Sequence, residues 1–185
     1  MKKAFKQAGF TMIEMMIVVA ILAIIFSMAM PSYRVWIENT RIRNAAESIQ
    51  NGMQQARTEA LQRNALVRFT LNGNTTRWQV GCVTVVADND GDGKEDCPAV
   101  IHQRTTVDNS TTLTTTPLPG GTSVITYNGI GSRVAIPAAP ELTSVTVDNT
   151  SIAAADSREL RVTIGVGGNV KMCDPNLPAG DLRRC

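Results

Sequence analysis

A short acidic segment carries the residues whose types and spacing come closest to a known chemistry. Asp88, Asp90 and Asp92 alternate along the chain and a glycine follows, as at the start of a calcium-binding loop of the EF-hand type. Asp96 stands at the ninth position of such a loop, but Ala99 occupies the twelfth, where a bidentate glutamate is required. The same residue types also form acidic hairpin turns. The segment is therefore predicted to be a turn, with a weak Ca²⁺ site as the alternative.

Beyond this segment, the chain offers little that would support catalysis. His102 is the only histidine, and the sequence contains no nucleophile elbow, phosphate-binding loop or histidine dyad. The cysteines form no C-x-x-C pair, which argues against a zinc site. We therefore expect a protein that is not an enzyme and requires no cofactor.

Four cysteines would form two disulfides in an oxidising compartment. Cys82, Cys97, Cys173 and Cys185 allow three pairings. Proximity along the chain favours Cys82–Cys97 and Cys173–Cys185, and each closed loop would stabilise the fold by about 3 kcal/mol. Whether the cysteines lie in such a compartment depends on the N-terminal segment.

The N-terminal segment is predicted to cross a membrane. The chain has 185 residues and a formal net charge of +2, but its apolar residues and its charges are unevenly spread. Residues 10–30 are almost entirely apolar, and as a helix they would span about 30 Å, the thickness of a bilayer core. Lys2, Lys3 and Lys6 precede them without an acidic residue, which places the N-terminus in the cytoplasm. The remainder of the chain then lies in the periplasm, beyond the inner membrane.

Glu14 is the one acidic residue inside this apolar segment. A carboxylate at depth in a bilayer costs about 2.5–3.5 kcal/mol on insertion scales, so it needs a partner or a function. Gly9 precedes the apolar residues, and cleavage there would remove the basic leader while keeping the helix. Phe10 would then carry a new α-amino group one helical turn before Glu14. The two charges could pair within one chain or between neighbouring chains.

Residues 9–14, Gly-Phe-Thr-Met-Ile-Glu, resemble the signature of type IV prepilins and of the pseudopilins of type II secretion. The resemblance implies cleavage between Gly9 and Phe10 by prepilin peptidase, N-methylation of Phe10, and a role for Glu14 in assembly with other pilins or pseudopilins. It also implies that Pro31 ends or kinks the membrane half of the helix. The signature departs from the family pattern only at Met12, which replaces a leucine.

The rest of the chain shows two periodicities, which together predict an α+β fold of the type IV pilin kind. Residues 32–64 carry apolar side chains at spacings of three and four, as in an amphipathic helix that packs on a head. From residue 65 the period changes to two, and short segments rich in Val, Ile and Thr favour an antiparallel sheet.

The predicted organisation has four parts: a leader (1–9), a transmembrane helix (10–31), its amphipathic continuation (32–64) and a β-rich periplasmic head (65–185). Within the head, Thr105–Pro119 lacks a clear period and is predicted to be a loop. The predicted strands are Ala65–Leu71, Arg77–Ala87, Ala99–Arg104, Thr122–Tyr127, Arg133–Ile136, Leu142–Val147, Glu159–Val166 and Asn169–Cys173.

Two segments of the head resemble minor pilins and pseudopilins of the GspH/FimT type. Residues 78–102 resemble the hairpin of that family, although Cys82 replaces its usual tryptophan, and residues 173–185 resemble its terminal segment. The resemblance implies a minor member of the family, which primes or caps filament assembly. The terminal disulfide loop resembles pilins more than secretion pseudopilins, which favours a minor pilin of a type IV pilus. A GspH-like minor pseudopilin of the type II secretion system is the alternative.

A third interpretation is a minor pilin that binds DNA in natural transformation. Some FimT-type pilins bind DNA through a C-terminal G-R-x-R motif. Here Asp181 replaces the first arginine of the motif, while Arg183 and Arg184 remain. Two arginines would contact about two phosphates, so only weak, salt-sensitive DNA binding is expected.

Overall fold

A computed structural model describes residues 9–88, 91, 95–105, 112–135 and 140–185, without the side chains of residues 28, 29 and 31. The leader residues 1–8, and Asp90 and Asp92 of the acidic segment, lie outside the described residues. The chain divides into two compact units between Ile37 and Glu38. This division falls inside the predicted amphipathic continuation of the helix, so the two units are described separately.

The N-terminal unit consists of the first part of helix α1, which runs from Met12 to Arg63. Its large apolar side chains are exposed; Phe10, Met12 and Met16 are each more than 70% accessible. No single described helix is long and apolar enough for a membrane span, but Met12–Ser27 and Ser32–Arg63 qualify together as a bent pair. The predicted kink at Pro31 falls in the break between these pieces and remains a prediction, since the side chain of Pro31 is outside the described residues.

In the second unit, α1 buries an apolar stripe against the strands, as the spacing of its apolar residues predicts. The first left-handed residue after the helix is Asn64, at a φ of 48°, which is a common way for a helix to end. The fully buried stripe residues are Ile42, Ala45, Ala46, Ile49, Met53, Ala56 and Ala60.

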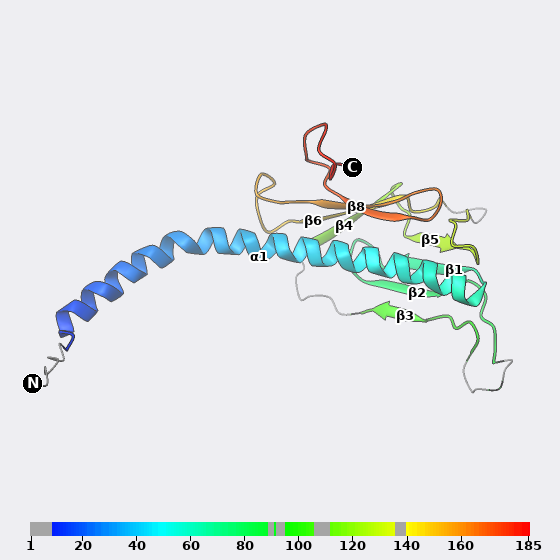
Figure 1. Ribbon diagram of the computed structural model, residues 1–185, viewed down its shortest axis with the longest axis horizontal. Coiled ribbons are helices and arrows are strands. Elements are labelled where there is room, and N and C mark those ends of the chain that lie inside the picture. The colour runs from blue at the N-terminus through cyan, green and yellow to red at the C-terminus, as the bar shows by residue number, and fades with distance from the viewer. Residues whose placement is uncertain (1–8, 89–90, 92–94, 106–111, 136–139) are drawn as a thin grey trace, which may run out of the picture. The chain divides into compact units, whose positions relative to one another are not determined.

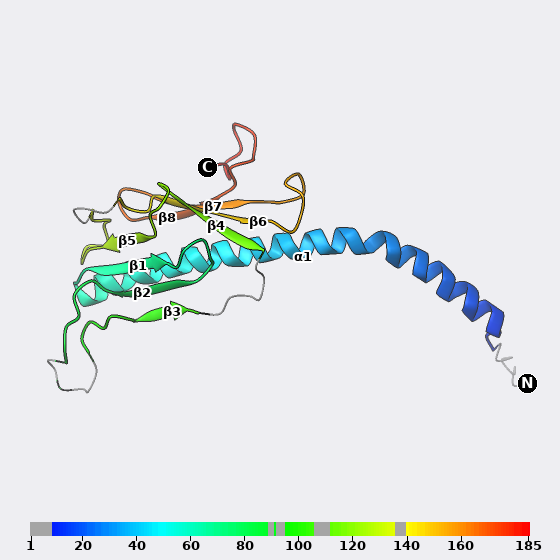
Figure 2. The same ribbon diagram turned by 180° about the vertical axis from the view of Figure 1, so that it is seen from behind.

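Two antiparallel four-stranded sheets pack against this part of the helix and share one core with it (Figures 1 and 2). The first sheet has the order β3-β2-β1-β5, and the second has the order β4-β6-β7-β8. Their strands are β1 (Val67–Leu71), β2 (Trp78–Cys82), β3 (His102–Arg104), β4 (Leu113–Leu118), β5 (Val124–Tyr127), β6 (Ser144–Asn149), β7 (Leu160–Ile164) and β8 (Val170–Cys173).

The structure corrects the prediction that Thr105–Pro119 is a loop, because Leu113–Leu118 forms β4. This strand pairs with β6 along its whole length and buries Leu113 and Thr115. Threonine suits a half-buried pleated surface, and Pro117 is tolerated because β4 is an edge strand. The partner strand follows some thirty residues later, so no local period reveals the pairing.

Three further strand predictions were too long. The predicted strand Ala99–Arg104 is shortened to β3. Of the predicted strand Arg133–Ile136, the described residues form only an isolated bridge between Arg133 and Tyr127. The predicted strand Arg77–Ala87 is shortened to β2 and an isolated bridge at Val86. A β-branched sequence therefore forms a ladder only over the length that a neighbouring strand pairs with it.

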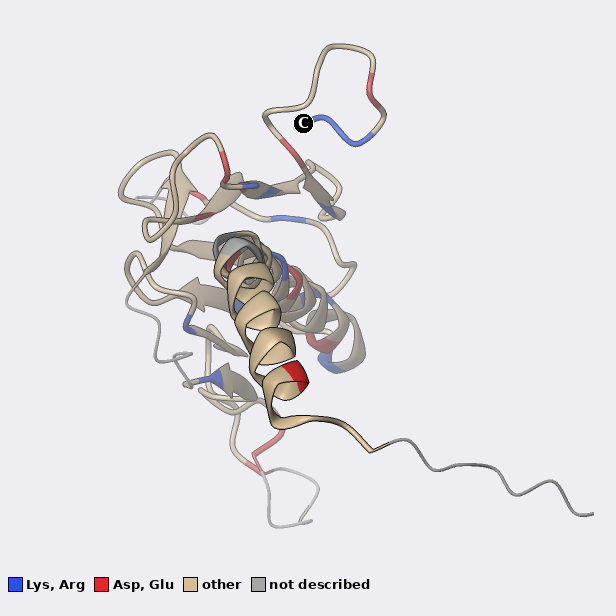
Figure 3. Ribbon diagram, turned by 90° about the vertical axis from the view of Figure 1, so that its left-hand side faces the viewer, with Lys and Arg blue, Asp and Glu red and all other residues tan. Residues whose placement is uncertain are grey.

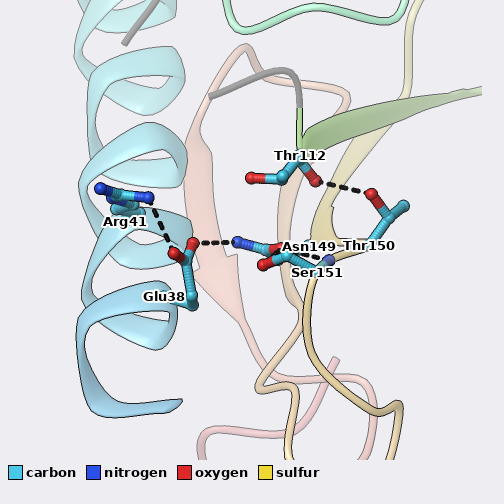
Figure 4. Close-up of polar contacts among 6 residues, drawn as sticks. All are labelled: Glu38, Arg41, Thr112, Asn149, Thr150 and Ser151. Atoms are coloured by element: carbon cyan, nitrogen blue, oxygen red, sulfur yellow. Dashed lines mark hydrogen bonds and ion pairs between the residues drawn. The ribbon is translucent and has the colours of Figure 1, made fainter. Parts of the chain in front are cut away.

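A polar contact secures the point at which α1 enters the second unit (Figure 4). Glu38 is 8% accessible and accepts a hydrogen bond of 2.6 Å from Asn149 Nδ2, at the end of β6. Its other oxygen forms an ion pair of 2.8 Å with Arg41. Asn149 is held in turn because its Oδ1 accepts hydrogen bonds from the N–H and the hydroxyl of Ser151. This network fixes the register of the helix against the second sheet.

Gly52 allows the indole of Trp78 to lie on the helix, and its replacement is expected to destabilise the protein. A Cβ at residue 52 would lie 2.8 Å from the Trp78 ring and 2.9 Å from the ring of Phe69. Overpacking of this kind outweighs the gain in helix propensity, so Gly52→Ala should lower the free energy of unfolding by about 1–2 kcal/mol. Urea denaturation measures the change. The matched control is Asn51→Ala at the adjacent exposed position, and equal stability of the two variants would contradict this packing.

Candidate functional site

The start of α1 is closed by a reciprocal pair of hydrogen bonds between Thr11 and Glu14. The Glu14 N–H donates to Thr11 Oγ1 over 3.3 Å, and the Thr11 N–H donates to Glu14 Oε2 over 3.5 Å. This is a capping box, in which a threonine and a glutamate three residues later satisfy two free backbone donors. The T-x-x-E spacing at residues 11–14 is the sequence signal for this capping box.

Besides this structural role, Glu14 carries a negative charge. Its side chain lies in the exposed first turn of α1 and forms no ion pair among the described residues. Figure 3 shows the surrounding turns of the helix free of blue and red, apart from the acidic first turn. The capping box therefore leaves the charge of the carboxylate without an ionic partner among the described residues.

The apolar surface next to Glu14 is open and continuous. An open depression of about 570 Å³ follows the first turns of the helix, lined by residues between Phe10 and Ala23. Exposed apolar side chains on this scale indicate burial in a bilayer or against another protein chain. The described part of the N-terminal unit therefore has the surface of a helix that is buried in a bilayer or by another chain.

Both disulfides connect the cysteines that are neighbours along the chain. Cys82 pairs with Cys97 at a Cα–Cα distance of 5.7 Å, and Cys173 pairs with Cys185 at 5.0 Å. Cys97 is 2% accessible beside the core, whereas the loop closed by Cys173–Cys185 is mostly exposed. The first disulfide is therefore part of the packed head, and the second ties down the C-terminus.

The acidic segment has the contacts of a turn where the structure describes it. Asp88 Oδ1 accepts a hydrogen bond of 2.7 Å from the Gly91 N–H, and the carbonyl of Asp96 accepts one from Arg63. Among the described residues there is no cluster of three or more side chains placed to hold a metal ion. Since Asp90 and Asp92 lie outside those residues, the Ca²⁺ alternative remains untested.

Glu59 joins the end of α1 to the edge strand β3. It pairs with Arg63 at 2.8 Å and with His102 Nε2 at 3.2 Å. Burial by itself would raise the pKa of Glu59, but the hydrogen bonds from Arg63 and His102 outweigh burial and hold the pKa below its usual value. A carboxyl whose pKa is lowered on folding stabilises the protein above its unfolded pKa, and this stabilisation is lost as the pH falls.

The Glu59 network should therefore contribute to acid sensitivity. Between about pH 6 and pH 3 the urea midpoint of the wild type should fall more steeply than that of Glu59→Gln, which cannot ionise. Burial raises the pKa of Glu141, which has the opposite effect on stability but is shared by both proteins. Glu47→Gln is the control, because the Glu47–Arg43 pair is exposed. Parallel pH profiles of the wild type and Glu59→Gln would contradict the role of this network.

The C-terminal loop holds Arg183 in a bidentate ion pair with Asp181. Arg183 Nη2 and Nε donate to the two carboxylate oxygens over 2.9 and 3.2 Å. The hydrogen bonds from Arg183 lower the pKa of Asp181 to about 2, so the carboxylate stays charged and continues to neutralise the guanidinium. Arg184 is exposed at the end of the same loop. Of the two arginines predicted to contact DNA, one therefore already has an anionic partner.

Removal of that partner is expected to increase DNA binding. Asp181→Asn would free Arg183 for a phosphate and steepen the salt dependence of binding by about one charge. Fluorescence anisotropy with labelled duplex DNA and the detergent-solubilised full chain measures both quantities. Asp156→Asn makes the same charge change on an exposed loop away from the tail and serves as the control. Equal DNA affinity of the two variants would show that Arg183 does not contact DNA.

Known families match the N-terminal segment and most of the head. Residues 45–168 match the family described as type II transport protein GspH, and residues 4–30 match the prokaryotic N-terminal methylation motif. A fimbrial protein of Pseudomonas aeruginosa is 30% identical over 107 residues, which cover 58% of this chain and 68% of that protein. The crystal structure of the Pseudomonas aeruginosa type IV minor pilin FimU aligns with a TM-score of 0.51 and 17% identity. That alignment covers 79% of this chain and 95% of the FimU chain, and it shows a shared fold.

A long N-terminal helix with a methylation motif, packed in its second part on antiparallel sheets, defines a structural protein of the type IV pilin class. Because the family match spans most of the head, the chain belongs to the GspH family of minor pilins and pseudopilins. Membership implies processing by prepilin peptidase and assembly with other pilins. The N-terminal helix is typical of inner-membrane prepilins that assemble into pili.

Proposed function

We propose that this chain is a minor pilin that initiates or caps assembly of a type IV pilus. Prepilin peptidase would cleave between Gly9 and Phe10 and methylate Phe10, and Glu14 would pair with the Phe10 amine of a neighbour. The observation that supports this most is the exposed apolar start of α1, where Glu14 has no ionic partner among the described residues. The similarity to a fimbrial protein and to the fold of a type IV minor pilin favours a pilus.

The proposed life cycle begins with the helix in the inner membrane, the N-terminus in the cytoplasm and the head in the periplasm. Cleavage removes the basic leader, and the helix then moves from lipid into the filament. Two disulfides suit a head that matures in the oxidising periplasm.

Deletion of the gene tests the initiating role. A subunit needed only for initiation should change the number of pili per cell and leave their length unchanged, because elongation depends on the major subunit. Electron microscopy of the deletion strain and of the complemented strain measures both quantities. Unchanged pilus numbers would overturn the proposal, and uniformly shorter pili would indicate a shaft subunit.

A minor pseudopilin of the type II secretion system is the second candidate, because the matching family takes its description from type II transport. The same deletion strain distinguishes the two candidates. A pseudopilin should be needed for release of folded exoproteins while pili form normally. Secretion of a periplasmic reporter exoprotein, measured in the culture medium, provides this second readout.

A further inference from the structure

The end of the head where α1 finishes carries an exposed apolar surface, which we call the distal patch and define as Leu61, Ile130 and Val166. These side chains are 48%, 76% and 83% accessible. The segments that carry them touch each other. A Cβ on Gly131 would lie 3.3 Å from the Leu61 methyl groups, and one on Gly168 would collide with the Gly131 carbonyl oxygen. Exposed apolar side chains gathered in this way on an ordered surface indicate an interaction site.

The two loops of the distal patch are held by their own hydrogen bonds. Asn128 Oδ1 accepts hydrogen bonds from the N–H groups of Ile130 and Ser132, and the Gly131 N–H donates to the Asn128 carbonyl. At the other loop, the Gly168 N–H donates to the Gly165 carbonyl over 2.9 Å. Gly131 and Gly168 have φ angles of +73° and +79°, which glycine adopts without strain. A partner would therefore bind preformed loops and lose little conformational entropy.

Arg57 places a cation beside these apolar side chains. Its Nε donates to the Gly131 carbonyl over 2.9 Å, which fixes the guanidinium next to Leu61. The other arginines of α1 within the head are each paired with a glutamate one turn away: Arg41 with Glu38, Arg43 with Glu47 and Arg63 with Glu59. In the described part of the chain, no carboxylate lies within ion-pair distance of Arg57.

This combination specifies the chemistry of a partner. Apolar side chains alone would accept any apolar surface, but covering Arg57 without a counter-ion would leave a desolvated charge and oppose binding. A carboxylate on the partner would satisfy the guanidinium, and the surrounding apolar contacts would exclude water from the pair. The neighbouring Arg133 needs no such partner, because Glu141 lies 3.4 Å from it.

We propose that the distal patch docks a neighbouring pilin subunit of the filament, which presents an apolar side chain next to a carboxylate. This inference rests on the proposed assembly function. It adds a contact within the head to the contacts made by the N-terminal helix. Arg57 provides specificity, and Leu61, Ile130 and Val166 provide the apolar contact.

Photo-cross-linking in cells that assemble filaments tests this contact with the full chain. A photoreactive phenylalanine analogue at Val166 should form an adduct with another pilin, and mass spectrometry should find Asp or Glu within the cross-linked peptide. The same analogue at Ala154, on an exposed loop in the β6–β7 connection, is the control position. Arg57→Gln should reduce the Val166 adduct about tenfold, while Arg43→Gln, which removes a cation already paired with Glu47, should leave it unchanged.

A second variant covers the case in which Arg57→Gln disturbs the fold by releasing the Gly131 carbonyl. Ile130→Asp alters a highly exposed side chain and places a negative charge beside Arg57, so it should also abolish the adduct without changing the melting temperature. The proposal is overturned if Val166 yields no adduct, an adduct only with lipid or nucleic acid, or an adduct that Ile130→Asp leaves unchanged. Pilus counts in the deletion strain test the initiating role separately, since a docked subunit that is dispensable for initiation would still form the adduct.

Discussion

Glu14→Gln is expected to abolish incorporation into filaments while leaving the start of α1 intact. Glutamine can replace glutamate in the capping box with Thr11, so the hydrogen bonds that begin the helix should survive. Loss of the charge should also favour membrane insertion, because a carboxylate in the bilayer costs about 2.5–3.5 kcal/mol. The variant therefore separates the structural role of Glu14 from its proposed role in assembly.

The expected loss is large because the neighbour's amine would be buried without a counter-ion. Removing one partner of a buried ion pair costs about 3–5 kcal/mol, which corresponds to a decrease in incorporation of about a hundredfold or more. Quantitative immunoblotting of sheared filaments against the membrane fraction measures the incorporated share.

Thr11→Ala provides the matched control for Glu14→Gln. It removes the hydroxyl that receives the Glu14 N–H but keeps the carboxylate, so incorporation should fall far less. If Glu14→Gln enters filaments as well as the wild type, the charge is not what holds neighbouring subunits together. If Thr11→Ala is the more severely affected variant, the capping box is the functional feature.

The two disulfides are expected to differ strongly in their effect on stability, although they close loops of similar length. From loop length alone, each would contribute about 3 kcal/mol by restricting the unfolded chain. Cys82–Cys97 should reach this value, because Cys97 is 2% accessible and both ends of its loop are held in the packed head. Cys82→Ser combined with Cys97→Ser should therefore lower the free energy of unfolding by about 3 kcal/mol.

Cys173–Cys185 should contribute much less to the unfolding of the whole protein. Without this disulfide, the mostly exposed residues 174–185 can come loose in the folded state as well as in the unfolded state. The gain in entropy then nearly cancels, and Cys173→Ser with Cys185→Ser should cost less than about 1 kcal/mol.

Urea denaturation of the two double variants measures the difference between the disulfides. Limited proteolysis should cut the tail of the Cys173→Ser, Cys185→Ser variant while its head stays intact. Equal losses of stability in the two variants would mean that the tail is part of the cooperative core.

Local signals in the sequence were reliable where one segment carried the whole pattern. The apolar positions of α1 from Ile42 to Ala60 all lie in the core, as their spacing of three and four predicted. The strands predicted at β1, β5 and β8 are present in the structure, with ends shifted by one or two residues. The prediction failed at β4, because a threonine-rich segment becomes a strand only when β6 lies beside it.

The sequence alone determined the class of the chain and its motif at residues 9–14. It did so because apolar length, charge placement and helical spacing are local properties. The tertiary structure decided which partner holds each arginine of the second part of α1. Arg41, Arg43 and Arg63 have a glutamate one turn away, whereas Arg57 is held by a carbonyl brought from 74 residues further along the chain.

The partners of Glu38 and Arg183 also depend on the folded chain. In the sequence Glu38 is an ordinary helix residue, but folding buries it against Asn149, more than a hundred residues away. The composition counts Arg183 as one positive charge, but the turn of the C-terminal loop pairs its guanidinium with the Asp181 carboxylate. A charge acts through the groups that lie within a few ångströms of it, and the sequence gives no distances between residues that folding brings together.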